Sequence, residues 1–597
     1  MCGIAGLQVA AHAQVPAGAL TILRRGILHR GPDAQSQFVA ENTALVVTRL
    51  AIVDLVHGDQ PLFSPNRSVV VANGEIYNSP ELRGRFPDYP FKSDSDCEVI
   101  LPLYGAYGTA FAEHLRGMYA IALFDPNTRE LVLSRDPFGI KPLYFVEGED
   151  HFAFASEISP LLDAAFAQPE LDETARTELL QLKYVYGSKT IFPNIQRIEP
   201  GETIVVRDGK IRSRTSMPTW PPNAQCRNSA KDARRSRRSS GQLVADFEKT
   251  IFDSVKVHLR ADVSSRLLYS GGIDSTILML AMREVSEARV PALTIGYEDD
   301  EAEDESWDAL RLADKAGVAC ERIEMTQEDF WNLAPRIVAA IDDPMADPAV
   351  LPLYMLGGAV AKQGGKIALC GEGADEIFGG YRRYQRALFP DFLRRRSGRR
   401  GVLSKTPIVT SDVWMQAADS LEKKQSQSWS SRTQVLQAID ILERLPNCLL
   451  IKLDRALMAH GVEGRTPFLD LEVMRFSSEV PEKSLVSLRM GKRVLRDWVY
   501  KMFPEAAPYA RKKGFNVPLG KWMHARRAEL GALVAGQPGI AQVAAPASVQ
   551  QIFDECLSDG QPAWSLLFYA LWHSHHILRI DCNRDIISVL SDASHAR

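Results

Sequence analysis

The chain has 597 residues, of which 45% are hydrophobic and 24% are charged, and its formal net charge is -4. This length predicts two to four domains, and the composition is that of a globular protein. The small net charge gives no general attraction to nucleic acid or acidic membranes, no apolar run approaches the roughly 20 residues that span a bilayer, and the N-terminus lacks the pattern of a secretory signal.

Residues 1–210 are predicted to form a domain rich in strands. Short apolar or alternating runs recur between turn residues, at 44–53, 68–77, 118–125 and 130–136. Helices are predicted near 98–107 and 174–182. This pattern is typical of layered sheets that are partly covered by helices.

Residues 211–242 are predicted to be a linker, because "PTWPPNAQ" is rich in proline and "KDARRSRRSSG" is basic and polar. Its four clustered arginines are Arg234, Arg235, Arg237 and Arg238. They could contact nucleic acid, but no aromatic residue is interleaved and the rest of the chain is slightly acidic. A solvated linker is the favoured interpretation.

Residues 243–580 are predicted to form an α/β domain with a doubly wound parallel sheet, because helical and strand patterns alternate. The alternation runs through a helix at 243–259, a strand at 265–270, a helix at 275–287, a strand at 291–297, a helix at 307–316, a strand at 320–325, a helix at 329–341 and the strand of "GKIALCGEG". Ligands bind such sheets at the carboxyl ends of the strands. The remainder is mostly helical. We expect a poorly ordered insertion at 394–432 and a fraying tail at 581–597.

The eight cysteines are scattered and form no C-x-x-C pair. They therefore predict neither a zinc site nor a disulfide framework, and they favour a reducing, cytoplasmic environment. Cys2 stands apart from the others. Removal of the initiator methionine would leave it with a thiol and an α-amine, whose pKa near 8 lets it accept a proton. Cys2 would then supply nucleophile and base together.

Six motifs follow in order: "MCGIAG", "HRGPD" (29–33), "RLAIVDL" (49–55), "NGEIYN" (73–78), "SDSDCEVI" (93–100) and "RDPFGIKPLY" (135–144). Together they resemble the glutaminase domain of class II glutamine amidotransferases. The resemblance covers residues 1–210 and implies a layered α+β fold of the N-terminal-nucleophile (αββα) type. It implies that Cys2 attacks glutamine and that Asn73 and Gly74 stabilise the oxyanion. The implied glutamine-binding residues are Arg49 for the carboxylate, Glu75 and Asp96 for the ammonium group, and Leu50, Ile52, Val53, Asn73 and Gly74.

A glycine turn, "YSGGIDST" (269–276), connects a predicted strand to a predicted helix. The backbone N–H groups of such a turn can face a phosphate, although the lysine of a P-loop is missing. Asp274 would place a carboxylate beside the phosphates, which suits a bridging Mg²⁺ ion. The turn resembles the pyrophosphate loop of ATP pyrophosphatases, which cleave ATP between the α and β phosphates.

Further motifs extend this resemblance: "DDPMADPAVLPLY" (342–354), "CGEGADEIFGGY" (370–381), "LIKLDRALMAHGVEGRTPFLD" (450–470), "GKRVLRDWV" (491–499) and "KKGFNVPLGKW" (512–522). With the turn, they resemble the synthetase domain of glutamine-hydrolysing asparagine synthetases over residues 243–525. The implied ATP-binding residues are Leu268, Ser270, Gly271, Gly272, Asp274, Ser275, Ile295, Cys370 and Gly371. The resemblance assigns Asp274 and Asp375 to magnesium, Glu372 to proton handling as ammonia attacks, and Lys492 to the α-phosphate.

The resemblance thus implies that aspartate, ATP and glutamine yield asparagine, AMP, pyrophosphate and glutamate, with ATP and Mg²⁺ required and ammonia channelled between domains. The expected partners are these small molecules, without nucleic acid or membrane, and a homodimer is left open. Three departures keep another acceptor carboxylate open: Cys370 where the family has serine, Tyr269 where it has leucine, and an atypical region at 390–440. Ring closure of the β-lactam synthetase type is disfavoured because Cys2 is intact. A non-enzymatic sensor is disfavoured because the catalytic positions are all present.

Overall fold

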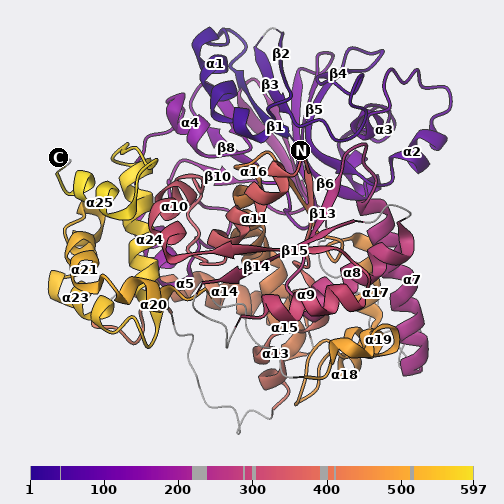
Figure 1. Cartoon of the computed structure of the whole chain (residues 1–597). Helices are drawn as coiled ribbons and strands as arrows, with labels where there is room; N and C mark the ends of the chain where they lie inside the picture. The colour runs from indigo at the N-terminus through magenta and orange to yellow at the C-terminus, as the bar shows by residue number, and fades with distance from the viewer. Residues whose placement is uncertain are drawn as a thin grey trace.

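The computed structural model describes residues 2–40, 42–217, 238–286, 290–298, 304–389, 401–408, 412–429, 431–510 and 517–595. Within them lie two six-stranded sheets and one five-stranded sheet. Figure 1 shows the first two sheets in indigo and purple at the top, the third in the middle, and the last helices in yellow at the left.

The two six-stranded sheets are antiparallel and belong to the N-terminal part of the chain. In spatial order, the first contains β10 (Gln196–Arg197), β8 (Tyr144–Glu147), β9 (His151–Ala155), β1 (Cys2–Val9), β3 (Thr43–Arg49) and β2 (Ala34–Ala40). The second contains β12 (Lys210–Ser216), β11 (Glu202–Arg207), β7 (Glu130–Arg135), β6 (Gly117–Asp125), β5 (Val69–Ile76) and β4 (Leu62–Phe63).

Three apolar layers hold this part together. Ile4 and Val71 belong to the layer between the two sheets. Helices α1 (Ala17–Gly26) and α4 (Ser159–Asp163) cover the outer face of the first sheet, and α5 (Glu173–Leu182) packs against the C-terminal helix α24 (Gly560–His576). Helices α2 (Ser79–Arg85) and α3 (Ile100–Tyr107) cover the second. Because β1, β3 and β5 are buried on both faces, apolar residues dominate their sequences. The predicted αββα layering is confirmed.

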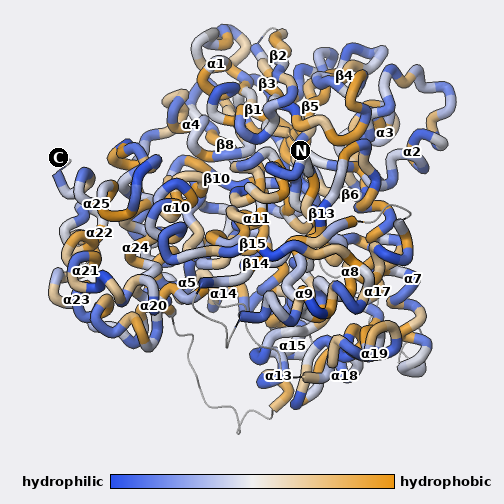
Figure 2. The backbone as a smooth tube through the Cα atoms, in the orientation of Figure 1, coloured by the Kyte–Doolittle hydropathy of each residue, from blue (hydrophilic) through white to orange (hydrophobic). Residues whose placement is uncertain are grey.

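The third sheet is parallel, with β15 (Cys320–Met325), β14 (Ala292–Tyr297), β13 (Ser265–Leu268), β16 (Ile367–Leu369) and β17 (Glu463–Arg465) in spatial order. Among the helices around it are α7 (Ser240–His258), α8 (Ile273–Val285), α9 (Ser306–Lys315), α10 (Gln327–Ala339), α11 (Val350–Lys362), α16 (Leu450–Met458) and α19 (Arg493–Met502). Figure 2 shows hydrophobic segments in orange at β5 and hydrophilic segments in blue along α9. The predicted doubly wound α/β arrangement is confirmed.

Two sequence-based expectations about order are wrong. Helix α14 (Val413–Ser428) lies inside the predicted insertion, and its Trp414 and Ala418 are buried one turn apart. The segments 390–400 and 409–411, like residue 430, lie outside the described residues. Helix α25 (Ile586–His595) occupies the predicted fraying tail. It buries Ile586, Val589, Leu590 and Ala593. That spacing is one apolar helix face, which anchors the segment by packing.

The connection between the two parts is only partly described. Strand β12 ends at Ser216, and α7 begins at Ser240 behind a capping box of Ser239 and Gln242. The basic segment of the predicted linker, up to residue 237, lies outside the described residues, so the domain boundaries stay a prediction. In the part of the chain that the structure describes, no helix is long and apolar enough to cross a membrane.

Candidate active site

Cys2 is the first residue of β1 and is almost completely buried. It pairs with Arg49 at the end of β3. The backbone nitrogen of Cys2 donates to Oδ1 of Asn73 at 3.1 Å, and Asn73 lies on β5 of the other sheet. The site is therefore built where the two sheets of the sandwich meet.

The environment of Cys2 opposes a free thiolate. Burial raises the pKa of the Cys2 thiol, and the backbone N–H of Leu50 acts in the opposite direction by hydrogen bonding to the sulfur. A neighbouring base is thus needed to deprotonate the thiol at neutral pH. Leu50 is buried directly after Arg49, so the position predicted for glutamine binding also faces the nucleophile.

Asn73 carries an unused donor at this place. Its Oδ1 accepts from Cys2, whereas its Nδ2 is buried and has no hydrogen-bond partner among the described residues. A buried donor without a partner is costly unless a ligand completes it. Gly74 follows, and a Cβ there would lie 2.1 Å from the carbonyl oxygen of Met118. Only glycine lets the backbone of β5 approach β6 this closely.

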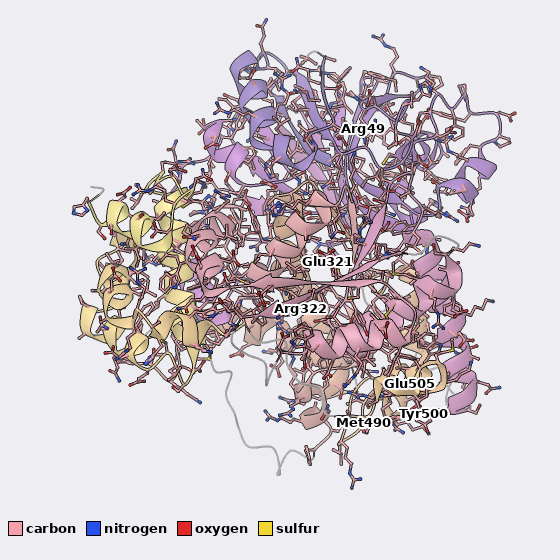
Figure 3. The ribbon with its side chains drawn as sticks, in the orientation of Figure 1. Arg49, Glu321, Arg322, Met490, Tyr500 and Glu505 are labelled. Carbon is pink, nitrogen blue, oxygen red and sulfur yellow. The ribbon has the colours of Figure 1, made fainter. Side chains whose placement is uncertain are left out.

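Arg49 fastens the segment that follows it. Its guanidinium donates to Asp59 at 2.8 Å and to the carbonyl oxygens of Val53 and Asp54 at 3.2 and 2.6 Å. Figure 3 shows Arg49 in the N-terminal part. The residue thus shapes the loop beside the nucleophile, and the predicted grip on a substrate carboxylate stays a prediction.

Glu75 and Asp96 supply two carboxylates next to one another. The backbone N–H of Ile76 donates to Asp96 at 2.5 Å, and Glu75 lies 3.1 Å from the guanidinium of Arg465. Burial raises the pKa of both carboxyl groups. A ligand ammonium group would offset this cost, which agrees with the predicted role.

The glycine turn lies at the carboxyl end of β13, as predicted. Ser270 Oγ lies 3.2 Å from Ser275 Oγ and accepts the N–H of Gly272 at 3.3 Å. Gly271 has a φ of +73°, which glycine adopts without strain. Gly272 is the N-cap of α8, and no side chain caps this helix end. Its first N–H groups are therefore suited to an anion.

Lys492 lies across this helix start. Its Nζ is 2.8 and 2.6 Å from the two carboxylate oxygens of Asp274 and 2.6 Å from Asp375. Burial opposes its charge, but the two carboxylates outweigh burial and raise the pKa of Lys492. Gly371 approaches so closely that a Cβ there would lie 2.9 Å from the Cβ of Asp274. Four predicted residues are thus brought together.

The two carboxylates fit a magnesium ion that also binds phosphate. The described residues contain no group of three or more His, Cys, Asp or Glu side chains that would hold a metal by themselves. Mg²⁺ is commonly bound by one or two carboxylates together with substrate phosphates. Asp274 and Asp375 provide two carboxylates that both contact the ammonium group of Lys492. Their oxygens are therefore suited to a Mg²⁺ ion that is also bound by substrate phosphates.

The predicted adenosine positions lie on adjacent strands. Leu268 pairs with Leu293 of β14, two residues before Ile295, and both predicted residues are buried. Tyr269 and Cys370 are the two residues near the turn that differ from the family pattern. Tyr269 is buried, with its hydroxyl 3.3 Å from that of Thr276. Cys370 is buried, and its thiol lies 3.6 Å from the carbonyl oxygen of Arg465.

Glu372 lies in a cluster of charges that the motifs did not assign. Lys452 Nζ is 3.6 Å from Glu372 and 3.2 Å from Asp347. Burial opposes the charge of Asp347, but Lys452 and Lys183 outweigh burial and lower its pKa to about 2. Lys452 and Asp347 stand inside quoted motifs, whereas no local pattern marks Lys183.

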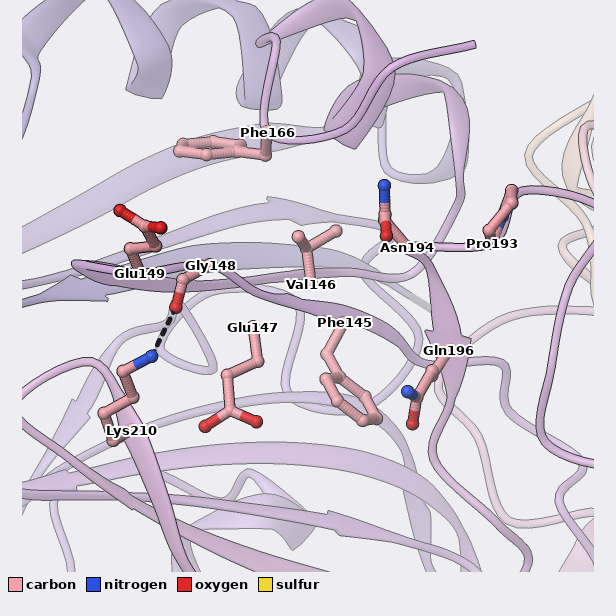
Figure 4. A pocket seen from close by; sticks show the side chains of 10 residues that line it. All are labelled: Phe145, Val146, Glu147, Gly148, Glu149, Phe166, Pro193, Asn194, Gln196 and Lys210. Carbon is pink, nitrogen blue, oxygen red and sulfur yellow. Dashed lines mark hydrogen bonds between the residues drawn. The ribbon is translucent and has the colours of Figure 1, made fainter. Parts of the chain in front are cut away.

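A separate pocket of about 520 Å³ lies on the N-terminal part, between the β8–β9 hairpin and β10. Figure 4 shows Phe145, Phe166, Glu147 and Lys210 around it, with Lys210 Nζ donating to the carbonyl oxygen of Gly148 at 2.7 Å. None of the predicted site residues lines this pocket. The candidate sites are therefore defined by their side chains, and not by this cavity.

Comparison with known proteins gives matches over most of the chain. Residues 1–217 match the family model described as "Glutamine amidotransferase domain", and residues 246–574 match "Asparagine synthase". The chain is 30% identical to "Asparagine synthetase [glutamine-hydrolyzing] 1" of Bacillus subtilis, over 92% of each chain. It is 32% identical to a "Putative asparagine synthetase [glutamine-hydrolyzing]" of Mycobacterium tuberculosis, covering 96% of this chain and 95% of that one. It is 26% identical to "Amidase chry2" of Gibberella zeae, covering 84% and 86%.

Proposed function

The chain belongs to the asparagine synthase family, and a glutamine amidotransferase domain precedes its synthase domain. We infer its reaction from this membership. It is a glutamine-hydrolysing carbon–nitrogen ligase, and ATP is a substrate of the family. We propose that aspartate is its acceptor, so that aspartate, ATP and glutamine yield asparagine, AMP, pyrophosphate and glutamate.

Nitrogen would be released at Cys2. Once Met1 is removed, the α-amine of Cys2 can take the proton of the thiol, which burial otherwise holds protonated. The sulfur then attacks the side-chain amide of glutamine, and the unpartnered Nδ2 of Asn73 can donate to the oxyanion. Ammonia leaves, and water hydrolyses the remaining thioester to glutamate.

The acceptor would be activated at the glycine turn. An acceptor carboxylate oxygen attacks the α-phosphorus of ATP, and pyrophosphate leaves. The N–H groups at the start of α8 and the cation of Lys492 can stabilise the charge that develops on the phosphates. Asp274 and Asp375 would hold Mg²⁺, which supplies positive charge to the phosphate oxygens when it is bound.

Ammonia would then attack the acyl-adenylate, and AMP would leave. Glu372 can accept the proton that the attacking nitrogen loses, while Lys452 at 3.6 Å balances its charge. We propose that ammonia travels inside the protein between the two sites. Arg30 of the N-terminal part pairs with the buried Asp454 of the C-terminal part at 2.8 Å, and Arg455 lies 2.9 Å from the same carboxylate.

The observation that supports adenylation best is the position of Lys492 between Asp274 and Asp375, beside a turn that lacks the P-loop lysine. The test is pyrophosphate and AMP formation from ATP, aspartate and ammonia. Cys2→Ala should abolish glutamine-dependent synthesis and keep ammonia-dependent synthesis. Formation of ADP, or loss of both activities in a folded Cys2→Ala variant, would contradict the proposal.

A second candidate keeps the chemistry and changes the acceptor. It is supported by Cys370, a buried thiol beside the glycine turn where the family has serine. It is also supported by the 26% identity to an enzyme named as an amidase. A screen of carboxylic acids with ammonia, read by pyrophosphate release, separates the candidates. A carboxylic acid other than aspartate that gives the highest kcat/KM would favour this second candidate.

A further inference from the structure

One face of a continuous helical segment leads to Glu372, the proposed proton acceptor. The segment η6 (Asp440–Leu449) continues directly into α16, and Arg444, Cys448 and Lys452 follow one another along it at intervals of four residues. Residues at this interval lie on the same face of a helix. Because Lys452 is 3.6 Å from Glu372, this face borders the place where the acceptor is activated.

Lys183 reaches the same place from the N-terminal part of the chain. It is the C-cap of α5, in a left-handed conformation, and its carbonyl oxygen accepts the N–H of Ala346 at 2.8 Å. Its Nζ donates to Oε1 of Gln561 on α24. The backbone of Lys183 is thus fixed beside Asp347, which follows Ala346 and belongs to the charge cluster of Glu372.

The thiol of Cys448 lies among three cations. Burial is the main cause that raises its pKa to about 12, and Asp347 acts in the same direction. The charges of Arg444, Lys452 and Lys183 oppose this rise. Cys448 is buried and stays neutral at pH 7, so it cannot balance these cations. We call Arg444, Lys452 and Lys183 the cation cluster.

Two members of the cation cluster have no anion of their own. Lys452 is paired with Asp347 at 3.2 Å. Arg444 lies with its guanidinium carbon 4.9 Å from the centroid of the Tyr381 ring, and neither Arg444 nor Lys183 forms an ion pair with another residue that the structure describes. Burial lowers the pKa of Lys183, and the nearby Asp347 does not outweigh it. A bound anion would therefore stabilise both cations.

The carboxylates around the cation cluster are already bonded. Asp347 accepts a backbone N–H at 3.1 Å in addition to its pair with Lys452. Glu372 lies beside the same lysine. Glu376 is buried and accepts the hydroxyl of Tyr381 at 2.5 Å. The charge balance therefore favours a ligand with a second anionic group, and it offers little to a ligand ammonium group.

We propose that Arg444 and Lys183 bind the second carboxylate of the acceptor, and that the enzyme also amidates dicarboxylic acids that carry no amino group. One carboxylate attacks the α-phosphorus of ATP and releases pyrophosphate. Ammonia then replaces AMP and loses one proton to Glu372, while the second carboxylate stays unchanged. The proposal rests on the proposed function, because it needs an acyl-adenylate beside Glu372. Aspartate meets the same requirement through its α-carboxylate.

The test measures pyrophosphate release by the full chain with ATP, Mg²⁺ and ammonia, and it compares three acids. Succinate is aspartate without the amino group, and β-alanine is aspartate without the α-carboxylate. The kcat/KM for succinate should lie within about 10-fold of that for aspartate, which is about 1.4 kcal/mol. The kcat/KM for β-alanine should be at least about 30-fold below that for succinate, the usual cost of a charge left without its partner.

Arg444→Met and Lys183→Met should each lower kcat/KM for succinate at least about 10-fold and change that for β-alanine less than about 2-fold, since β-alanine has no second carboxylate. Arg444→Lys should recover part of the preference for succinate. The ratio of the two values in one preparation does not depend on the fraction of folded enzyme, so structural damage alone does not move it. If Lys183→Met fails to fold, Gln561→Glu gives Lys183 a carboxylate and should also lower the ratio.

Arg383→Met is the matched control, because Arg383 also faces the Tyr381 ring, at 4.7 Å, but is paired with Asp440. It should keep the parent's ratio of succinate to β-alanine. A parent that uses aspartate but not succinate, or uses succinate and β-alanine equally, overturns the proposal and leaves the proposed function intact. An unchanged ratio in both Arg444→Met and Lys183→Met does the same. Absence of pyrophosphate release with all three acids contradicts the proposed function as well.

Discussion

The guanidinium of Arg465 lies 3.1 Å from the carboxylate of Glu75, although Arg465 belongs to the parallel sheet and Glu75 to the N-terminal sandwich. The backbone carbonyl of Arg465 accepts the N–H of Cys370 at 2.9 Å. Glu75 is predicted to bind the substrate glutamine, and Cys370 is predicted to bind ATP. Arg465 therefore contacts both candidate sites at once, and it is completely buried.

Replacing Arg465 by methionine should destabilise the protein by about 3–5 kcal/mol, because Glu75 and Glu463 would remain buried without their cation. Chemical denaturation followed by intrinsic fluorescence measures this loss. The double variant Arg465→Met/Glu75→Gln should recover part of it, since one unpaired charge is then removed. Equal stability of Arg465→Met and the parent would contradict this account.

The sequence predicted those site residues that belong to recognisable motifs, even where the motifs lie far apart in the chain. Cys2 with Asn73, and Asp274 with Asp375 and Lys492, are brought together across long sequence separations as the resemblance implied. The strands were predictable because β1, β3, β5 and β14 are buried on both faces and are therefore composed mostly of apolar residues.

What the sequence did not predict depends on tertiary contacts. Lys183 ends α5 in a left-handed conformation and affects Asp347, and nothing in its neighbouring residues marks this role. Arg465 and Lys366 bind across the interface between the two parts. Helix α14 was missed because its polar composition outweighed a narrow apolar face that packing makes decisive. Helix α25 was missed because the last residues of a chain are expected to fray unless they pack, and its apolar face does pack.

Asn73→Ala should lower kcat for glutamine hydrolysis by about 10²–10³, the usual cost of one oxyanion donor. The reason is the loss of Nδ2, the buried donor without a partner. Ammonia-dependent pyrophosphate release should not change. Asn78→Ala in the same motif is the control: its amide bonds to the backbone of His114 and Arg116, so it should affect stability more than kcat. Similar kcat losses in both variants would argue against an oxyanion role for Asn73.

Lys492→Met should reduce ammonia-dependent pyrophosphate release by at least about 10²-fold, because the cation that joins Asp274 and Asp375 is lost from the proposed phosphate site. Lys492→Arg should not restore full activity, since a planar guanidinium does not replace a compact ammonium group between two carboxylates. Glutamine hydrolysis should continue in both variants. Lys501→Met, on the same helix but paired with Glu248 at the surface, should behave like the parent.

His258 should make stability depend on pH. It is buried on α7, its ring centroid is 4.1 Å from that of Tyr77, and its Nδ1 lies 2.8 Å from the carbonyl oxygen of Ser254. Burial is the main cause that lowers its pKa to about 3, and the nearby charges of Arg465 and Arg116 act in the same direction. The folded protein therefore holds this imidazole neutral well below its ordinary pKa of about 6.5.

Between pH 6.5 and 3 the unfolded chain binds a proton at His258 that the folded protein does not, so stability is complete above pH 6.5 and falls as the pH decreases. The contribution of His258 to the slope of the unfolding free energy against pH approaches about 1.4 kcal/mol per pH unit. The free energy of unfolding, measured by denaturant titration from pH 7.5 to 5, should fall less steeply for His258→Asn than for the parent. Other titrating groups contribute equally to both curves, so the difference in slope isolates His258. His12→Asn, at an exposed position, should keep the parent slope, and parallel curves for the parent and His258→Asn would show that His258 is not held neutral.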